Sequence, residues 1–256
     1  MTSAMPQPSA DPIGHTSLAL LEARRLHTRV PAPGLADAAA AYAVQRAVLA
    51  GLGDPADATP GHWKTGGTGP ATHAPLPAAG VLRSPADARA LPLRLRLVEA
   101  ELALRLGRDV GPDEAARATP DTAADWVDAV CVSIELVESR WLEGLHASGP
   151  DKLADLQSHG ALVLGDWRPF AARDWRRQRC TVRIGTREAV ERIGTHPLGD
   201  PLRGLPEWAR HASAGGTVLR AGTVVTTGSW VGMLEAAAGE TVEVVFEGLG
   251  EASVGL

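Results

Sequence analysis

Two glutamates placed two residues apart in an apolar run constrain this sequence most. The run begins at Leu93, and Glu99 and Glu101 lie inside it. Residues two apart in a β-strand face the same side, so both carboxylates project together, about 7 Å apart along the chain. By the same alternation, that face also carries Leu95 and Leu97. An isolated ionised carboxylate is too costly to bury, whereas carboxylates around a hard cation are not.

A second strand-like run, residues 130–137, carries a third glutamate. Its alternation puts aliphatic side chains on one face and Cys131, Ser133 and Glu135 on the other. Three carboxylates, without the spacing of a zinc site or an EF-hand, favour Mg²⁺ or Mn²⁺. A solvated strand face agrees equally well with the spacing alone, since charged residues are mostly exposed.

Composition narrows the class of protein. A chain of 256 residues can bury a sizeable core, and its net charge of −5 comes without a basic, aromatic-rich stretch. We therefore expect no nucleic-acid partner. No apolar run reaches the ~20 residues of a membrane span, and residues 1–14 do not resemble a signal peptide. These features predict a cytoplasmic protein without a membrane partner. Cys131 and Cys180 are predicted to be buried thiols.

Periodicity predicts two helices followed by a mostly β body. Helices are expected over residues 17–30, capped by Thr16 or Ser17, and over residues 35–52. Residues 53–80 should form a loop with at most one short strand, around Trp63 and Lys64. Further helices are expected at 121–129 and 202–213. Strands are expected near 93–106, 130–137, 160–165, 179–185, 223–227 and 241–247.

Strands interrupted by occasional helices favour an α+β fold built on a mixed sheet or roll. We predict three regions. Residues 1–15 form a disordered tail, residues 16–70 a helical N-terminal subdomain with a glycine-rich loop, and residues 71–256 the β domain.

Several segments, in order, resemble the fumarylacetoacetate hydrolase superfamily, in particular its branch of 2-keto-4-pentenoate hydratases and 4-oxalocrotonate decarboxylases. The resemblance runs from about Tyr42 to the C-terminus. It is carried by segments 41–45, 64–68, 98–109, 134–140, 160–165, 196–202 and 227–229.

The resemblance implies the β-roll of that superfamily and a divalent metal held by Glu99, Glu101 and Glu135. It also implies Lys64 in the active site and a homo-oligomer, with association with a related decarboxylase or hydratase. A 2-oxo acid chelates a metal through its carboxylate and 2-oxo oxygen, and a Lewis acid then stabilises the enolate. Lys64 would add positive charge at the developing oxyanion or shuttle a proton.

Other catalytic and binding residues follow from the matching segments. Ser158 is a candidate hydrogen-bond donor to the substrate and His159 a second acid or base. The segment Thr227-Gly228-Ser229 is a further candidate for substrate binding. The sequence departs from the branch where its usual Asp-Asn-x-Ser-x-Gly carries Leu156 in place of Asn, and in the loop at 74–81. The chemistry is therefore better defined than the substrate.

The sequence predicts a metal-dependent lyase, a hydratase or decarboxylase, acting on a small 2-oxo-enoate such as 2-oxo-4-pentenoate, as in meta-cleavage catabolism of aromatic compounds. One alternative is C–C bond hydrolysis of an acylpyruvate, for which His159 or Glu138 would have to activate water. The other is a catalytically weak partner subunit.

Overall fold

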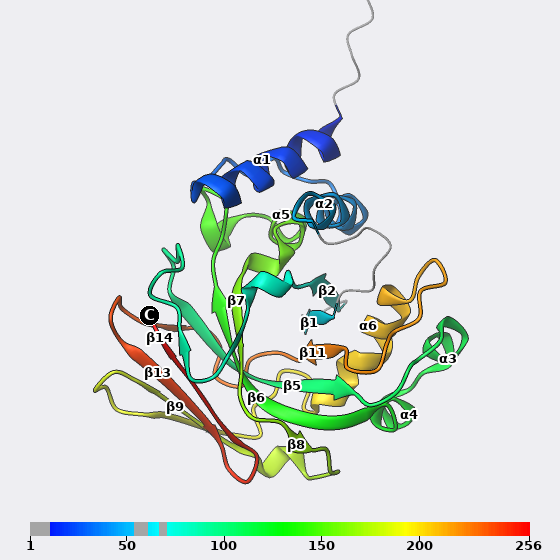
Figure 1. The fold of residues 1–256 in the computed structure, drawn as a ribbon, viewed down its shortest axis with the longest axis vertical. Helices are drawn as coiled ribbons and strands as arrows, with labels where there is room; N and C mark the ends of the chain where they lie inside the picture. Colours follow the sequence, from blue (N-terminus) through cyan, green and yellow to red (C-terminus); the bar gives the residue numbers. More distant parts are fainter. Residues whose placement is uncertain (1–10, 54–60, 67–70) are drawn as a thin grey trace, which may run out of the picture.

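Two β-sheets and a group of helices make up the fold in the computed structural model (Figure 1), which describes residues 11–53, 61–66 and 71–256. The larger sheet has nine strands, in the order β2-β1-β11-β5-β6-β7-β3, with β12 beside β5 and β8 beside β6. Its strands are β1 (His62–Gly66), β2 (Thr72–Pro75), β3 (Val81–Arg83), β5 (Leu97–Leu106), β6 (Val127–Val137), β7 (His159–Leu164), β8 (Arg168–Pro169), β11 (Val224–Thr226) and β12 (Leu234–Glu235).

The smaller sheet has five strands, in the order β10-β9-β13-β14-β4. They are β4 (Ala86–Asp87), β9 (Arg179–Ile184), β10 (Val190–Ile193), β13 (Thr241–Phe246) and β14 (Gly250–Gly255). Both sheets contain parallel as well as antiparallel pairs, because β1 runs parallel to β11 and β4 parallel to β14. The predicted α+β class with a mixed β-roll is confirmed.

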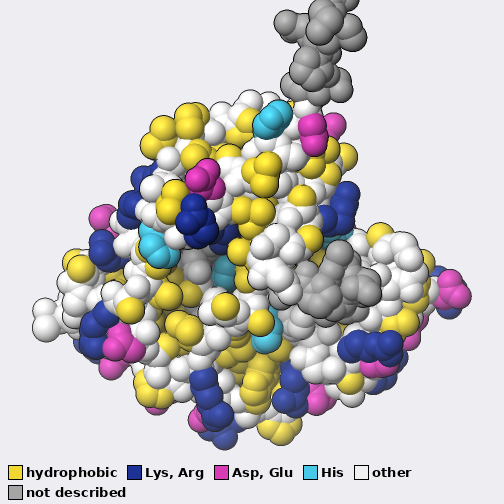
Figure 2. All heavy atoms as spheres, turned by 45° about the horizontal axis from the view of Figure 1, so that its top comes forward, with side chains coloured by type: hydrophobic (Ala, Val, Ile, Leu, Met, Phe, Trp, Pro, Cys, Tyr) yellow, Lys and Arg dark blue, Asp and Glu magenta, His cyan; other side chains and the backbone are white. Residues whose placement is uncertain are grey.

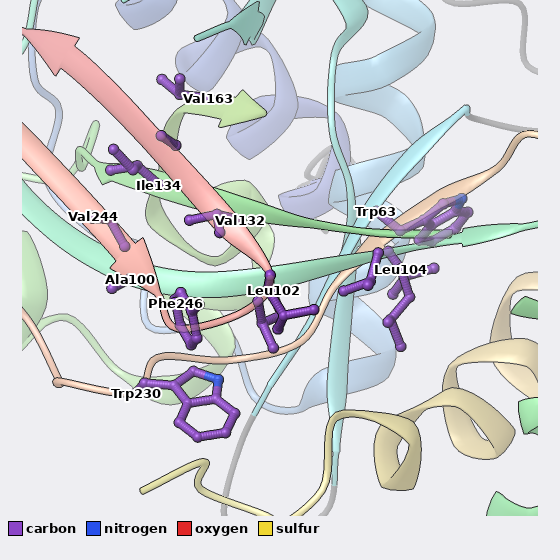
Figure 3. Close-up of a cluster of buried hydrophobic side chains, with 14 of the residues drawn as sticks. Trp63, Ala100, Leu102, Leu104, Val132, Ile134, Val163, Trp230, Val244 and Phe246 are labelled. Carbon is purple, nitrogen blue, oxygen red and sulfur yellow. The ribbon is translucent and has the colours of Figure 1, made fainter. Parts of the chain in front are cut away.

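The main core fills the space between the two sheets. On β5 and β6 the inward residues alternate, as a period of two requires. Figure 3 shows Leu102 and Val132 from these strands near Val244 and Phe246 of β13. This face of the large sheet is entirely apolar along β5 and β6, so the polar residues of both strands occupy the opposite face.

Helices cover that opposite face. Helices α1 (Pro12–Leu26), α2 (Ala38–Gly51) and α5 (Gly149–Ala154) lie together in Figure 1 and share a second hydrophobic cluster. The remaining helices are α3 (Pro112–Arg117), α4 (Pro120–Ala124) and α6 (Leu205–Ala212), with short 3₁₀ segments η1 (Ala78–Gly80), η2 (Gly144–His146), η3 (Leu156–Ser158), η4 (Trp175–Arg177) and η5 (Pro201–Gly204). Among the described residues, no helix has the length and apolar character needed to cross a membrane.

The first helix begins earlier than predicted. Asp11 caps it by accepting from the backbone N–H of Gly14, and Pro12 occupies the first turn, a position that suits proline. The predicted caps, Thr16 and Ser17, instead donate to carbonyls one turn back inside the helix. Residues 12–15 are thus helical rather than part of a tail, while residues 1–10 lie outside the described part.

One further helix and one strand also end or begin at residues other than those predicted. The helix expected at 121–129 ends at Ala124, because Trp126 turns into the core and β6 begins at Val127. The strand expected from residue 93 begins at Leu97, because Arg96 has a left-handed φ of 45°. Leu93 therefore packs in the main core and not on the carboxylate face.

The loop predicted over residues 53–80 contains more structure than expected. Strand β2 pairs antiparallel with β1, so both belong to the large sheet. The predicted domain boundary at residue 70 therefore falls inside a hairpin. Residues 54–60 and 67–70, which include Gly67 and Gly69 of the glycine-rich loop, lie outside the described residues.

The sequence did not predict β3, β4, β8, β10, β12 or β14, but its other predicted strands are present. The five strands predicted after the first are present as β6, β7, β9, β11 and β13. The helix expected at 202–213 is present as η5 followed by α6. Cys131 and Cys180 are buried free thiols, as predicted. On the face that Figure 2 draws, Lys and Arg are interspersed with Asp and Glu rather than gathered into one basic patch.

The contact between the sheets should dominate stability. Replacing the fully buried Phe246 by alanine is expected to lower the free energy of unfolding by about 3–5 kcal/mol, since it removes a large side chain and leaves a cavity. Val245 is 41% exposed on the same strand, so Val245→Ala is the matched control. Urea unfolding of both variants tests this, and equal losses would contradict the described packing.

Candidate active site

The three glutamates lie on one face of the large sheet. In the pairing of β5 with β6, Glu99 stands directly opposite Glu135, and Glu101 opposite Ser133. Residues paired in this way share a face. The face is the one turned away from the core between the sheets.

Lys64 lies on the same face of the sheet, on strand β1, which is separated from β5 by β11. It pairs with Thr226 of β11, which in turn pairs with Ala103 of β5. Its ammonium lies 3.0 Å from Glu135 Oε1 and 3.3 Å from the carbonyl oxygen of Gln157. Lys64 is therefore a buried residue of the carboxylate cluster, not a surface lysine of a glycine-rich loop.

The cluster borders a cavity of about 760 Å³ between the sheet and the helical layer. The sheet contributes Lys64, Glu99 and Glu101, and α5 contributes Lys152 and Leu153. The rest of the lining is mixed: Ala38, Thr65, Gly66, Thr72, Val137, Leu145, Gly149, Pro150, Gln157, Ser158, Pro197, Gly228, Ser229 and Met233. A concave, largely apolar cavity of this size with a few polar groups suits a small molecule.

The ion pair between Lys64 and Glu135 keeps both groups charged. Burial lowers the pKa of Lys64, but the charges of Glu135, Glu99 and Glu101 outweigh it and the pKa is raised. Burial works to raise the pKa of Glu135, but the Lys64 charge and the His159 contact outweigh it and the pKa is lowered. A buried charge persists only with such a partner.

Glu99 and Glu101 have less compensation. Burial, together with the charge of the neighbouring Glu101, raises the pKa of Glu99 to about 8. Burial also raises the pKa of Glu101, although Thr226 and the backbone N–H of Gly228 donate hydrogen bonds to its carboxylate. In the metal-free site, Glu99 and Glu101 are therefore held toward their protonated, neutral forms, while Lys64 and Glu135 form the charged pair.

His159 lies behind Glu135. Its Nδ1 is 2.9 Å from Glu135 Oε1, its side chain is almost fully buried, and it does not line the cavity. Burial lowers the pKa of His159 in spite of the nearby carboxylate. The geometry lets it orient Glu135, but gives it no direct access to a bound molecule.

The predicted substrate-binding residues divide into two groups. Ser158, Gly228 and Ser229 line the cavity. Thr227 does not, because its hydroxyl donates to the carbonyl of Leu102 at 2.8 Å and its own carbonyl contacts His196. Thr227 thus fixes the loop after β11 and is not itself placed to touch a ligand.

Glu138, three residues beyond Glu135, lies outside the carboxylate cluster and does not pair with Arg140, its neighbour two residues along the chain. Strand β6 ends at Val137, so the simple alternation does not continue. Glu138 pairs with Arg29 at 3.3 Å, and Arg140 pairs with Asp155 at 2.7 Å.

The structure adds residues that the sequence did not indicate. Thr226 donates to Glu101 and also contacts Ser133. Gln157 accepts from Lys64 through its carbonyl and donates to Thr72 at 2.6 Å. The period-two alternation of β11 could have placed Thr226, whereas Gln157 depends on a local backbone conformation that no sequence pattern indicates.

The chemical type of the donor atoms, carboxylate oxygens, suits a divalent cation. Three carboxylates share a face, two of them with raised pKa values, and oxygen ligands suit a hard cation. Within the described residues, Glu135 Oε2 and Ser158 Oγ are buried without a hydrogen-bond partner.

The side chains do not converge as they stand. In the described parts of the chain, no group of three His, Cys, Asp or Glu side chains is arranged to hold a metal ion. In this arrangement the Lys64 ammonium is bonded to Glu135, and the ligand set of Glu99, Glu101 and Glu135 stays a prediction.

Comparisons with known proteins agree with this geometry. The family model described as fumarylacetoacetate (FAA) hydrolase C-terminal matches residues 62–255. The chain is 33% identical over 161 residues to 2-keto-4-pentenoate hydratase 1 of Dechloromonas aromatica, covering 61% of this chain and 58% of that protein. It is 28% identical over 166 residues to a 4-oxalocrotonate decarboxylase of a Pseudomonas species, covering 61% and 59%. The alignments thus span less than two thirds of these relatives.

A solved structure shows the same fold over the whole chain. The 4-oxalocrotonate decarboxylase from Pseudomonas putida G7, complexed with magnesium and adipate, superposes with a TM-score of 0.82. The superposition covers 97% of this chain and 98% of that one, at 19% identity.

The raised pKa of Glu99 predicts a pH effect on the metal-free protein. Between about 4.5 and about 8 the folded state keeps a proton that the unfolded state loses, so the free energy of unfolding should fall as pH rises through this range. Glu99→Gln should flatten this dependence, and Glu251→Gln, at an exposed position, should not. Urea titrations in a chelator from pH 5 to pH 8 would contradict the assignment if all three proteins gave the same slope.

Proposed function

Since the chain belongs to the fumarylacetoacetate hydrolase family, we propose that it is a divalent-metal-dependent lyase, a hydratase or decarboxylase, acting on a small 2-oxo-enoate. The observation that carries the proposal is that Lys64, Glu99 and Glu101 line one cavity, with Glu135 paired to Lys64. The hydratase and decarboxylase relatives and the magnesium in the P. putida complex support it. The predicted pathway, meta-cleavage catabolism, belongs to the same proposal.

The proposed metal ligands are Glu99, Glu101 and Glu135. A divalent cation bound there would act as a Lewis acid on the carboxylate and 2-oxo oxygen of the substrate. The raised pKa values of Glu99 and Glu101 mean that a bound cation would displace their protons and stabilise both carboxylates in the charged form. Mg²⁺ and Mn²⁺ both suit the carboxylate donors.

Lys64 and Ser158 are the proposed residues that act on the substrate directly. The charged ammonium of Lys64 is fixed by two acceptors, so it can stabilise negative charge that develops on the substrate without reorganising. Ser158 Oγ is buried at the cavity and, among the described residues, has no partner, which leaves its hydroxyl free to donate. His159 would orient Glu135.

The alternatives have less support from the geometry. Hydrolysis of an acylpyruvate requires a base that activates water. His159 does not line the cavity, and Glu138 is engaged by Arg29 and by the backbone N–H groups of Arg94, Leu95 and Ser139. A catalytically weak partner subunit remains the second candidate, because the loops around the cavity depart from the branch. Homo-oligomer formation remains a prediction.

Turnover of a panel of 2-oxo acids, followed by ultraviolet absorbance with and without Mg²⁺, tests the function. Hydration, decarboxylation and hydrolysis leave different products, so product analysis identifies the reaction. Turnover that a chelator abolishes and Mg²⁺ restores is the expected result. No turnover across the panel would favour the partner-subunit role.

The metal assignment predicts the behaviour of Glu101→Gln. The variant should fold but lose high-affinity Mg²⁺ or Mn²⁺ binding, because it deletes one ligand charge from the three-carboxylate site. Titration calorimetry measures the affinity, with the exposed Glu251→Gln as control. Unchanged affinity in a folded Glu101→Gln protein would refute the ligand assignment.

The role of Lys64 predicts a specific kinetic effect. Lys64→Ala should lower kcat by ~10²-fold or more and raise KM much less, because the lost charge acts mainly in the transition state. Circular dichroism should confirm that the variant is folded. A near-normal kcat would mean that Lys64 serves only to neutralise Glu135.

A further inference from the structure

Three consecutive non-glycine residues have a left-handed backbone next to the cavity. Leu156, Gln157 and Ser158 have φ values of 51°, 55° and 58°. This conformation costs about 1–2 kcal/mol per residue in an L-amino acid and usually occurs at single positions. Such a segment persists only where its surroundings determine it, and such segments concentrate at functional sites.

The turn delivers groups to the proposed active site. The carbonyl of Gln157 accepts from Lys64, and both Gln157 and Ser158 line the cavity. Within the described chain, Gln157 Oε1 and Ser158 Oγ are buried without partners. In an ordinary right-handed or extended backbone these groups would point elsewhere, so the catalytic arrangement depends on the turn.

Asp155 anchors the start of the turn. Its backbone carbonyl accepts from Ser158 N–H at 3.0 Å, which closes the turn. Its fully buried carboxylate accepts from the backbone N–H and Nε of Arg140, at 2.8 and 2.7 Å. On the far side, Ser158 accepts from the backbone N–H of Glu138 at 2.9 Å.

A second guanidinium reaches Asp155 from the N-terminal helix. Arg24 of α1 places Nη2 3.0 Å from Asp155 Oδ1, and its side chain is only 16% exposed. It lies on the inward side of α1, one turn after the fully buried Leu20. Arg24 also lies outside the residues 62–255 that match the family model.

Asp155 has two cationic partners, of which Arg140 is one. Asp155 is already paired with Arg140, so Arg24 adds a second positive charge to a neutralised pair. Burial, together with the charge of Arg140, lowers the pKa of Arg24 to about 10 in spite of Asp155, so the charge of Arg24 is held at a cost. Buried ion pairs are weak evidence for stability and can instead select one conformation.

We propose that Arg24 is a positioning residue: through Asp155, it holds the left-handed turn that presents Gln157 and Ser158 at the cavity. The N-terminal helix thereby becomes part of the active-site framework. The role of the turn in turnover rests on the proposed function, whereas the effect of Arg24 on the turn does not.

Hydrogen exchange followed by mass spectrometry tests the contact directly in the full-length chain. In Arg24→Gln, amides in the peptide that contains residues 155–159 should exchange at least ~10-fold faster, with Arg24→Lys intermediate because it keeps the charge but not the planar donors. Arg25→Gln is the control, because Arg25 is 70% exposed on the same helix and contacts only Glu22, at 3.7 Å, among the described residues. Its exchange should match the wild type.

Steady-state kinetics supply a readout that a purely structural role would not move. Arg24→Gln should lower kcat by at least ~10-fold with a melting temperature close to that of Arg25→Gln, since Asp155 keeps Arg140 as its partner, and Arg24→Lys should recover part of kcat.

The outcomes separate the two proposals. Exchange at 155–159 equal to that of Arg25→Gln, or faster exchange spread evenly over the whole protein, overturns the positioning role. Unchanged kcat with a loosened turn overturns it as well. A wild-type protein without turnover refutes the proposed function, and the exchange data then decide the contact between Arg24 and the turn by themselves.

Discussion

The ion pair between Lys64 and Glu135 is the interaction on which the site depends. Both side chains are buried, and each keeps its charge only because the other is 3.0 Å away. The pair also requires the large sheet to be complete, since Lys64 comes from β1 and Glu135 from β6, with β11 and β5 between them. The charges of Lys64 and Glu135 therefore compensate each other only when these four strands are assembled in one sheet.

The division of the large sheet into two faces makes this possible. One face is apolar and packs on the small sheet, which stabilises the fold without polar groups. The other face can then carry charges under the helical layer, in a cavity that shields them from bulk water. Interactions between charges strengthen in such surroundings, which favours both cation binding and catalysis by fixed charges.

The residues around the cavity act at different distances from it. Lys64 and Ser158 border the cavity itself, and His159 and Thr226 contact the carboxylates from behind or beside. Asp155, farther out, is joined through Arg140 and Arg24 to the rest of the molecule. The left-handed turn at residues 156–158 connects these outer contacts to the cavity. Side chains that are far apart in sequence therefore affect the position of the same few atoms.

The sequence alone determined the chemistry of the sheet face, because a period of two leaves no choice about which side chains share a side. Glu99 and Glu101 could be grouped for that reason, and the resemblance joined them to Glu135 and Lys64. Only the tertiary structure decided the ion-pair partners of Arg24 and Glu138. It also decided the left-handed turn at Gln157 and the position of Thr227 outside the cavity lining. These features depend on where strands end and on contacts between distant segments, and no local periodicity encodes either.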